Sequence, residues 1–208
     1  MTRIVLHYAP RSRSLRVLWL LEELGARYTL VPMSLARGDQ KRPEFLALNP
    51  MGKVPTVTID GHPVWETPAI IAHLCDVFPE ADLAPRLATP ARADFYRWLS
   101  FGTAVMEPAF MDLKKGHQVN ALQAGWGDFA SMKAALAAGL SEGDWILGSR
   151  FSGADVLIGG NLNWFTAWAP GDFDGIPGLP AYLDRIRARP ALIRAGEIEA
   201  ELAEKSPA

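Results

Sequence analysis

The sequence reads NPMGKVPT over residues 49–56 and WETPAI over residues 65–70, and these two segments carry most of its structural information. A proline at the start of a strand cannot donate to the sheet, and an X-Pro bond can be cis, which turns the chain sharply. Such a turn would expose the backbone N–H and C=O of Val54 to an extended peptide, which could bind by strand addition. Glu66 and Thr67 lie where a strand passes into a helix, and the free N–H groups there suit a carboxylate. Either segment alone would also fit an ordinary turn or an ordinary helix cap.

The residues around these segments alternate between strand and helix patterns. The predicted strands span residues 4–8, 28–31, 54–59 and 62–65. The predicted helices span residues 14–24, 43–48 and 67–78, the last with Thr67 as its N-cap, and Glu22 and Glu23 should face solvent. Asp60-Gly61 is a two-residue hairpin signal. The order β-α-β-α-β-β-α predicts a parallel strand pair with a helical crossover, extended by an antiparallel hairpin.

Strand patterns disappear after Pro79, and residues 80–89 are rich in Pro, Ala and Leu, as in a linker. The remaining apolar stripes predict helices at residues 90–115, 128–140, 154–169, 179–189 and 192–204. We therefore expect an α/β domain over residues 1–79, a linker over residues 80–89 and an all-helical domain over residues 90–208.

The composition excludes several classes of protein. The chain has 208 residues, of which 49% are hydrophobic and 21% charged, so it can build a real core. Its net charge of -2 and pI of about 6.1 provide no basic field for nucleic acid or an anionic membrane. No targeting segment is visible, and no apolar run approaches the ~18 residues of a membrane span. We expect a cytoplasmic protein.

Cysteine and histidine usage argues against disulfides and metals. The one cysteine, Cys75, excludes an intramolecular disulfide and a Cys-based zinc site, and it fits a small core or interface residue. The four histidines have no metal-ligand spacing. We expect no metal.

Taken together and in this order, the segments resemble the glutathione S-transferase family, in particular its bacterial members, over nearly the whole chain. The N-terminal half looks like the thioredoxin-like, glutathione-binding domain of that family. Residues 49–55 look like its cis-proline loop. Glu66-Thr67 looks like its Glu-Ser pair, with Thr in place of the usual Ser but with the hydroxyl retained.

The C-terminal half carries FSGAD at residues 151–155, which is similar to the buried Ser-x-x-Asp capping box of the family. In such a box Ser152 caps the helix and Asp155 reaches back to the N–H of the cap. The expected role of both residues is structural.

The resemblance implies that glutathione is the co-substrate. The residues expected to bind it are Arg11, Gln40, Lys53, Val54, Pro55, Glu66 and Thr67. The backbone of Val54 should pair with the cysteinyl unit, while Glu66 and Thr67 should hold the ammonium and carboxylate of the γ-glutamyl end. Lys53 and Gln40 should serve the glycyl carboxylate, although both also fit solvated surface.

The catalytic group must stabilise a thiolate, because a free thiol has a pKa of about 8.5. The family does this with Tyr, Ser or Cys between the first strand and the first helix, and here that segment is YAPRSRSLR, residues 8–16. Ser12 lies four residues before Arg16, a spacing that resembles Ser-type transferases, and it is the leading candidate. Tyr8 is an alternative because Tyr8-Ala9-Pro10 resembles Tyr-type members. Ser14 is a second alternative, although either serine could simply cap the helix.

Arg11 and Arg13 add positive potential beside the helix N-terminus, and one of them should favour the thiolate. No cysteine occurs in the segment, which argues against the Cys-type members of the family. The reactive sulfur should therefore arrive with glutathione.

The expected reaction is conjugation of glutathione to a small hydrophobic electrophile by a homodimeric detoxification enzyme. The electrophile should lie between the domains, against Pro10, Met106, Phe110 and Trp164, although these rings also fit a core. One alternative is glutathione-dependent reduction of peroxides or disulfides. Another is a non-catalytic binding module of the same fold.

Overall fold

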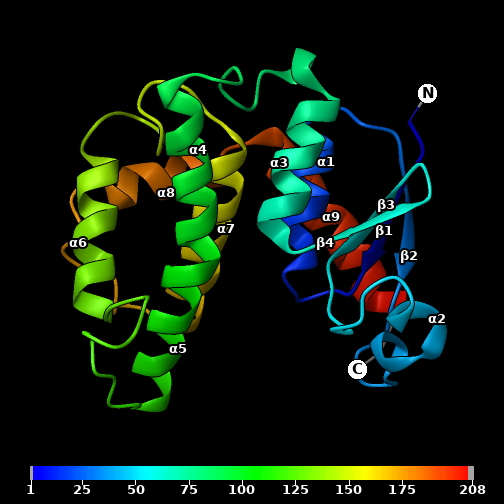
Figure 1. Ribbon diagram of the computed structural model, residues 1–208, viewed down its shortest axis with the longest axis horizontal. Helices are drawn as coiled ribbons and strands as arrows, with labels where there is room; N and C mark the ends of the chain where they lie inside the picture. Colours follow the sequence, from blue (N-terminus) through cyan, green and yellow to red (C-terminus); the bar gives the residue numbers. More distant parts are fainter. Residues whose placement is uncertain (1, 206–208) are drawn as a thin grey trace. The chain divides into compact units, whose positions relative to one another are not determined.

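The N-terminal half of the computed structural model, which describes residues 2–205, has the predicted order β-α-β-α-β-β-α (Figure 1). Its strands are β1 (Ile4–Tyr8), β2 (Tyr28–Pro32), β3 (Thr56–Ile59) and β4 (His62–Trp65). Its helices are α1 (Ser14–Glu23), α2 (Pro43–Leu46) and α3 (Thr67–Val77), with 3-10 turns at Asp39–Lys41 and Pro79–Ala81. The thioredoxin-like fold predicted for this half is confirmed.

The four strands form one sheet in the order β2-β1-β3-β4. β1 runs parallel to β2 and antiparallel to β3, and β4 is antiparallel to β3. Asp60 and Gly61 both have positive φ, 50° and 86°, as a two-residue hairpin of the favoured type requires. Asp60-Gly61 therefore forms the turn of the hairpin, as predicted from the sequence.

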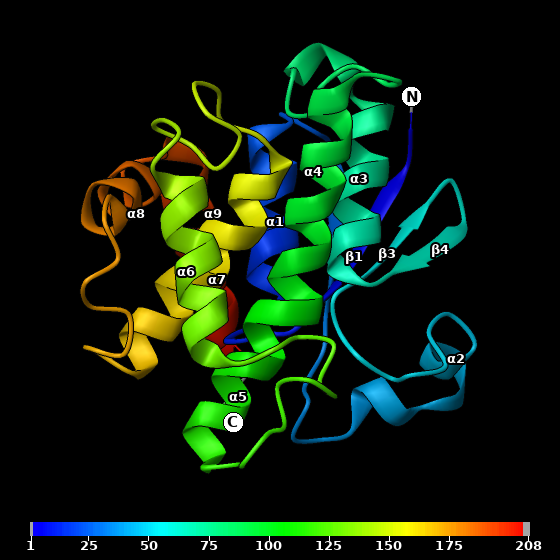
Figure 2. The ribbon, with the colours of Figure 1, turned by 60° about the vertical axis from the view of Figure 1, so that its left-hand side comes forward.

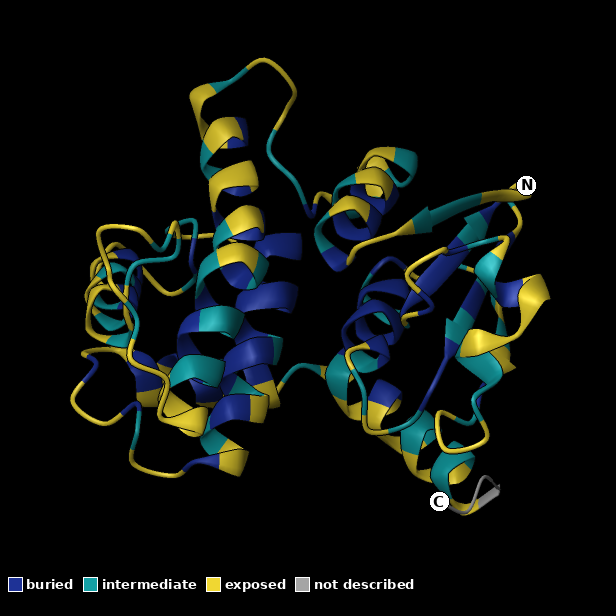
Figure 3. Ribbon diagram, turned by 60° about the horizontal axis from the view of Figure 1, so that its bottom comes forward, coloured by how far each residue is buried: buried dark blue, intermediate teal, exposed yellow. Residues whose placement is uncertain are grey.

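Helix α1 is buried almost all round, from Val17 to Leu21 (Figure 3). A helix that only covered one face of a sheet would expose its other side to solvent. The second cover is α9 (Pro190–Lys205), which packs along α1. The predicted exposure of Glu22 and Glu23 is therefore wrong. Arg189 binds the carboxylate of Glu23 through two nitrogens, at 2.5 and 2.7 Å, and Arg194 binds Glu22 at 3.0 Å.

The chain divides into two units, and this division differs from the predicted one. The second unit is Asp82–Arg187, and the first unit contains both the chain up to Ala81 and the chain from Ala188 onward. The predicted helical domain, residues 90–208, thus loses its last helix to the sheet domain. Helix α9 packs along α1, and Arg189 and Arg194 pair with Glu23 and Glu22, so this segment belongs with the first unit.

The second unit is all-helical (Figure 2). Its helices are α4 (Pro90–Phe101), α5 (Glu107–Lys115), α6 (Phe129–Leu140), α7 (Gly153–Trp168) and α8 (Leu179–Arg187), with a π-helical turn at Gly102–Met106 between α4 and α5. Helix α7 is buried along most of its length and packs against α4 and α8. Gly159 permits the contact with α8, because a Cβ there would lie 2.6 Å from Ile186. Within residues 2–205 no helix is long and apolar enough to cross a membrane.

Candidate glutathione site

Three segments of the first unit meet at one edge of its sheet. His7 pairs with Thr56, and Thr56 pairs with Trp65. The loop after β1, the start of β3 and the end of β4 therefore lie side by side. This edge brings together the candidate hydroxyls, Val54-Pro55 and Glu66-Thr67.

The Val54-Pro55 peptide bond is cis. Among residues 2–205, neither the N–H nor the C=O of Val54 has a hydrogen-bond partner. Backbone groups in folded proteins are nearly always paired, so an unpaired donor and acceptor on one residue form a ready site for an extended peptide.

Asn49 orders the loop that carries Val54, and the sequence analysis did not assign it a role. Its side chain is 2% exposed, its Nδ2 donates to Lys53 O at 2.9 Å and to Thr56 Oγ1 at 3.1 Å, and its Oδ1 accepts from Met51 N at 3.0 Å. The contact to Met51 is the two-residue turn that Asn favours. An Asn directly before a Pro in a turn was the available signal.

Gly52 lets a neighbouring segment approach this loop. Its φ is +59°, and a Cβ on it would lie 2.6 Å from Gln40 O and 2.8 Å from Lys41 Nζ. Gln40 and Lys41 therefore lie beside the loop, whereas Lys53 is exposed on it. The Gln40 Nε2 donates to Leu35 O at 3.3 Å, and the buried Oε1 has no partner within residues 2–205.

Glu66 and Thr67 begin α3, but not as predicted. Glu66 is the N-cap, with φ of +69°, and the buried Thr67 is the first helical residue. A positive φ at a non-glycine residue is uncommon, and such conformations concentrate at functional sites. Among residues 2–205, the hydroxyl of Thr67 has no hydrogen-bond partner.

The hydroxyl of Tyr8 is already engaged. Tyr8 is fully buried and donates to Glu199 Oε1 on α9 at 2.8 Å. Burial, and then the charge of Glu199, raise the pKa of Tyr8 far above its ordinary value. This phenol stays protonated and directs its proton at a carboxylate.

Ser12 and Ser14 differ in exposure. Ser14 is fully buried as the first residue of α1, whose N-cap is Arg13 rather than the serine considered for that role. Ser12 is partly exposed, and its Oγ lies 2.6 Å from Ala9 O and 2.9 Å from Ser14 Oγ. The same Oγ accepts from Ser14 N at 3.1 Å. Of the three candidate residues, only Ser12 keeps accessible surface.

Arg11 and Arg13 are exposed around Ser12, and Arg11 has a positive φ of 56°. The backbone N–H of Arg11 donates to Glu199 Oε1 at 2.8 Å. Glu199 was not predicted, and it lies far from Arg11 in the sequence, so no local pattern could indicate it.

The residues expected to line an electrophile pocket differ in burial. In the second unit Met106 and Phe110 are fully buried, and Phe110 stacks on Phe165 with ring centroids 4.1 Å apart. Trp164 is 40% exposed. In the first unit Pro10 is half-buried. The burial of Met106 and Phe110 favours their alternative role in the core.

The second unit contains the capping box at the start of α7. Asp155 is fully buried and accepts from Ser152 N at 2.9 Å, Ile146 N at 2.8 Å and the Tyr182 hydroxyl at 3.1 Å. The Ser152 hydroxyl accepts from Ala154 N. Burial raises the pKa of Asp155 to about 6, although these donors favour its charged form.

Cys75, in α3 of the first unit, is also buried.

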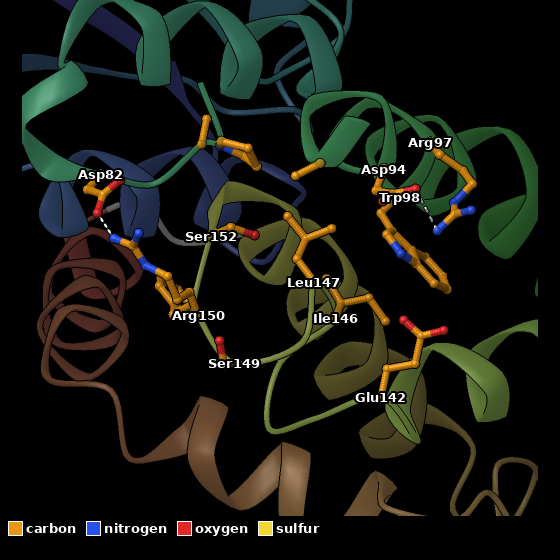
Figure 4. A pocket seen from close by; sticks show the side chains of 14 residues that line it. Asp82, Asp94, Arg97, Trp98, Glu142, Ile146, Leu147, Ser149, Arg150 and Ser152 are labelled. Carbon is orange, nitrogen blue, oxygen red and sulfur yellow. Dashed lines mark ion pairs between the residues drawn. The ribbon is translucent and has the colours of Figure 1, made fainter. Parts of the chain in front are cut away.

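A cavity of 260 Å³ is lined entirely by residues of the second unit. Figure 4 shows ion pairs among its side chains, Arg150 with Asp82 and Arg97 with Asp94. It includes no residue of the loop after β1 or of residues 49–67. Over the described part of the chain, no group of three His, Cys, Asp or Glu side chains could hold a metal ion.

The sheet with its cis-proline loop, followed by helices, defines a protein with a thioredoxin-like domain and an all-helical domain. Residues 1–76 match the model of the glutathione S-transferase N-terminal domain, and residues 119–185 match that of the C-terminal domain. A solved sphingomonad glutathione S-transferase, complexed with glutathione, is 32% identical with a TM-score of 0.78, covering 94% of this chain and 98% of its own. The chain belongs to the glutathione S-transferase family.

Two curated relatives differ in the activity that their names describe. Glutathione S-transferase GST-4.5 of Xanthomonas campestris pv. campestris is 28% identical, and the match covers 81% of this chain and 88% of the relative. Disulfide-bond oxidoreductase YfcG of Escherichia coli is 27% identical, over 90% of this chain and 92% of the relative.

Proposed function

We propose that this protein binds glutathione at the sheet edge and conjugates glutathione, through its sulfur, to a small hydrophobic electrophile. The observation that carries the proposal is the unpaired N–H and C=O of Val54, at the edge where Ser12 and Thr67 also lie. An extended γ-glutamyl tripeptide can add there as a short strand.

Each end of the tripeptide has a suitable partner. The backbone N–H and C=O of Val54 pair with the cysteinyl unit, and the ring of Pro55 packs beneath that unit. Glu66 takes the ammonium of the γ-glutamyl end, and Thr67 takes its carboxylate with its hydroxyl and the first N–H groups of α3. Lys53 and Gln40, with Lys41 beside them, serve the glycyl carboxylate.

Ser12 stabilises the thiolate. Its partly exposed hydroxyl turns from Ala9 O to donate to the sulfur, and Arg11 adds positive potential. The thiol proton leaves to solvent, a sulfur lone pair forms the new C–S bond, and the leaving group departs with its bonding electrons. Most of the catalysis is thiolate stabilisation and proximity.

Of the residues expected to contact the electrophile, Trp164 and Pro10 keep accessible surface and are the candidates that we retain, whereas Met106 and Phe110 are fully buried. We place this activity in a cytoplasmic homodimer with a detoxification role, in keeping with the resemblance.

The test is retention on a glutathione affinity resin combined with turnover of 1-chloro-2,4-dinitrobenzene. Specific elution by free glutathione, together with release of chloride and formation of the aryl thioether, is the expected result. Retention without turnover favours the binding-module alternative. Failure to bind glutathione in any assay contradicts the proposed function.

Glutathione-dependent disulfide reduction is the second candidate, and the relative named as a disulfide-bond oxidoreductase favours it. Two glutathione thiols would be oxidised to a disulfide while the substrate disulfide is reduced to two thiols. An assay with 2-hydroxyethyl disulfide separates the two: a larger kcat/KM for the disulfide than for the aryl chloride would favour reduction.

A further inference from the structure

The carboxylate of Glu199 connects the C-terminal helix to the loop that follows β1. Its Oε1 accepts from the Tyr8 hydroxyl and from the Arg11 backbone N–H, each at 2.8 Å. One oxygen therefore binds both the end of β1 and the residue directly before Ser12. All of these groups lie in the first unit.

The conformation of the loop requires such a partner. Arg11 has a φ of 56°, a region that a non-glycine residue enters at a cost. On its other side, Ser12 closes the loop on itself by contacts to Ala9 O and Ser14 N. The bond from Arg11 N to Glu199 fixes the strained residue, and so it fixes the direction in which the Ser12 side chain leaves the backbone.

Glu199 is itself held in place. Arg189, directly before α9, pairs with Glu23 of α1, Arg194 of α9 pairs with Glu22, and Ala195 of α9 is fully buried. Charge-assisted pairs of this kind are the stronger hydrogen bonds of proteins. The carboxylate therefore reaches the loop from a fixed helix.

We propose that Glu199 is a positioning residue for the reaction, which holds the loop of residues 9–14 so that the Ser12 hydroxyl meets the sulfur of glutathione. This inference rests on the proposed function, because Ser12 must be the residue that stabilises the thiolate. Glu199 acts through Arg11 and Tyr8 and does not touch the reacting atoms.

The test compares Glu199→Met with Glu199→Gln. Both substitutions preserve the length of the side chain, but only the Gln carbonyl oxygen can accept the two bonds. We expect Glu199→Met to lower kcat by at least about tenfold with a smaller change in the KM for glutathione, because misplacement costs rate more than affinity. We expect Glu199→Gln to restore kcat to within about threefold of wild type. Glu197→Met, at an exposed position of the same helix, is the matched control.

A second measurement reports the loop without any need for activity. Trypsin can cut after the exposed Arg11 and Arg13, and mass spectrometry identifies the released peptides. Loss of the two hydrogen bonds to residue 199 should raise the initial cleavage rate there by about tenfold in Glu199→Met but not in Glu199→Gln or Glu197→Met, both of which keep an acceptor at that position. Glu199→Ala, checked by circular dichroism, tests the same loss in case the Met side chain disturbs packing.

The outcomes are distinguishable. Equal kcat and equal cleavage in Glu199→Met and wild type overturn the inference, and so does a Glu199→Gln variant as impaired as Glu199→Met. A wild-type protein that neither binds nor conjugates glutathione contradicts the proposed function instead. In that case the trypsin comparison still decides whether Glu199 holds the loop.

Discussion

Ser12 and Tyr8 present hydroxyls with opposite availability to the same site. The Tyr8 proton is directed at the Glu199 carboxylate, whereas the Ser12 side chain keeps accessible surface beside the N-terminus of α1. A thiolate needs a donor that can turn toward it without giving up a hydrogen bond to a carboxylate. Ser12 satisfies this condition and Tyr8 does not.

Substituting the two residues separately tests this assignment. We expect Ser12→Ala to lower kcat by about 10²–10³-fold, as loss of one donor to a developing anion does elsewhere, and to raise the pKa of the bound thiol. Tyr8→Phe should instead lower the free energy of unfolding by about 1–3 kcal/mol, because the fully buried Tyr8 loses its hydrogen bond to a charged carboxylate. Ultraviolet titration of the bound thiolate and urea unfolding give the two readouts. If Ser12→Ala changes neither turnover nor the pKa of the thiol, the assignment is wrong and Ser14 becomes the candidate for the residue that stabilises the thiolate.

Asn49 acts at the same scale, through the loop and not through the ligand. Asn49→Ala removes the donors to Lys53 O and Thr56 Oγ1, so we expect a loss of about 1–3 kcal/mol in the free energy of unfolding and a larger Kd for glutathione. Urea unfolding and calorimetric titration measure these changes. Asn120→Ala, which removes a similar turn contact at an exposed position, is the control and should change neither. Unaltered glutathione binding by Asn49→Ala would show that the loop keeps its shape without it.

The residues that could be predicted from the sequence are those whose partners are close along the chain. Asp60-Gly61 contains the positive φ values of its own turn, and Ser152 and Asp155 cap one helix end. The partner of Arg11 is Glu199, which an α-helical pattern cannot distinguish from any other glutamate on the face of its helix. Sequence reasoning therefore found the hydroxyl candidates but could not choose between Tyr8 and Ser12 on physical grounds.

At the scale of elements, helix α7 depends on the buried carboxylate at its start. The pKa of Asp155 in the folded state, about 6, lies above its ordinary value of 3.8. Between about pH 4 and about pH 6 the folded state therefore binds a proton at Asp155 more tightly than the unfolded state does. The free energy of unfolding contributed by Asp155 therefore falls as the pH rises from about 4 to about 6. The charged form persists at neutral pH because four donors surround it.

Asp155→Asn should reveal this titration. The variant loses about 1–3 kcal/mol because its amide cannot accept from every donor. The loss should be largest near pH 4 and smaller at pH 7, since only the wild type carries the cost of ionisation. Urea unfolding at several pH values measures the difference, and Asp184→Asn, on the exposed face of α8, is the control. A loss that is the same at every pH would contradict the raised pKa, and a change in KM for glutathione would contradict a purely structural role.

Helix α9 shows why the predicted domain division differed from the observed one. The pattern of residues 192–204 correctly predicts a helix, but an apolar stripe does not specify which core it covers. Glu22 and Glu23 have the polarity of a solvent-facing surface, and the arginines that pair with them come from the other end of the chain. Local polarity indicates exposure only where no opposite charge covers it.

At the scale of the whole molecule, the proposed homodimer predicts a sedimentation mass of twice the 22.7 kDa of the chain. Met51, a 56% exposed apolar side chain of the first unit, is a candidate contact. Met51→Glu should raise the dissociation constant of the dimer, because a charge is costly in a buried contact. Leu122→Glu, at a 98% exposed position of the second unit, is the matched control. A monomer at all micromolar concentrations would contradict the dimer.

The placement of α9 also affects how the protein is made. Arg11 and Glu199 are 188 positions apart, so at about 5–20 residues per second a ribosome needs about 10–40 s to synthesise the second after the first. Until then the nascent sheet domain lacks its last helix, with α1 uncovered and the loop after β1 unheld. The sheet domain is therefore completed by a helix that is translated after the whole second unit, and a chain truncated before residue 190 should contain every predicted glutathione contact but lack the Glu199 carboxylate that binds the loop after β1.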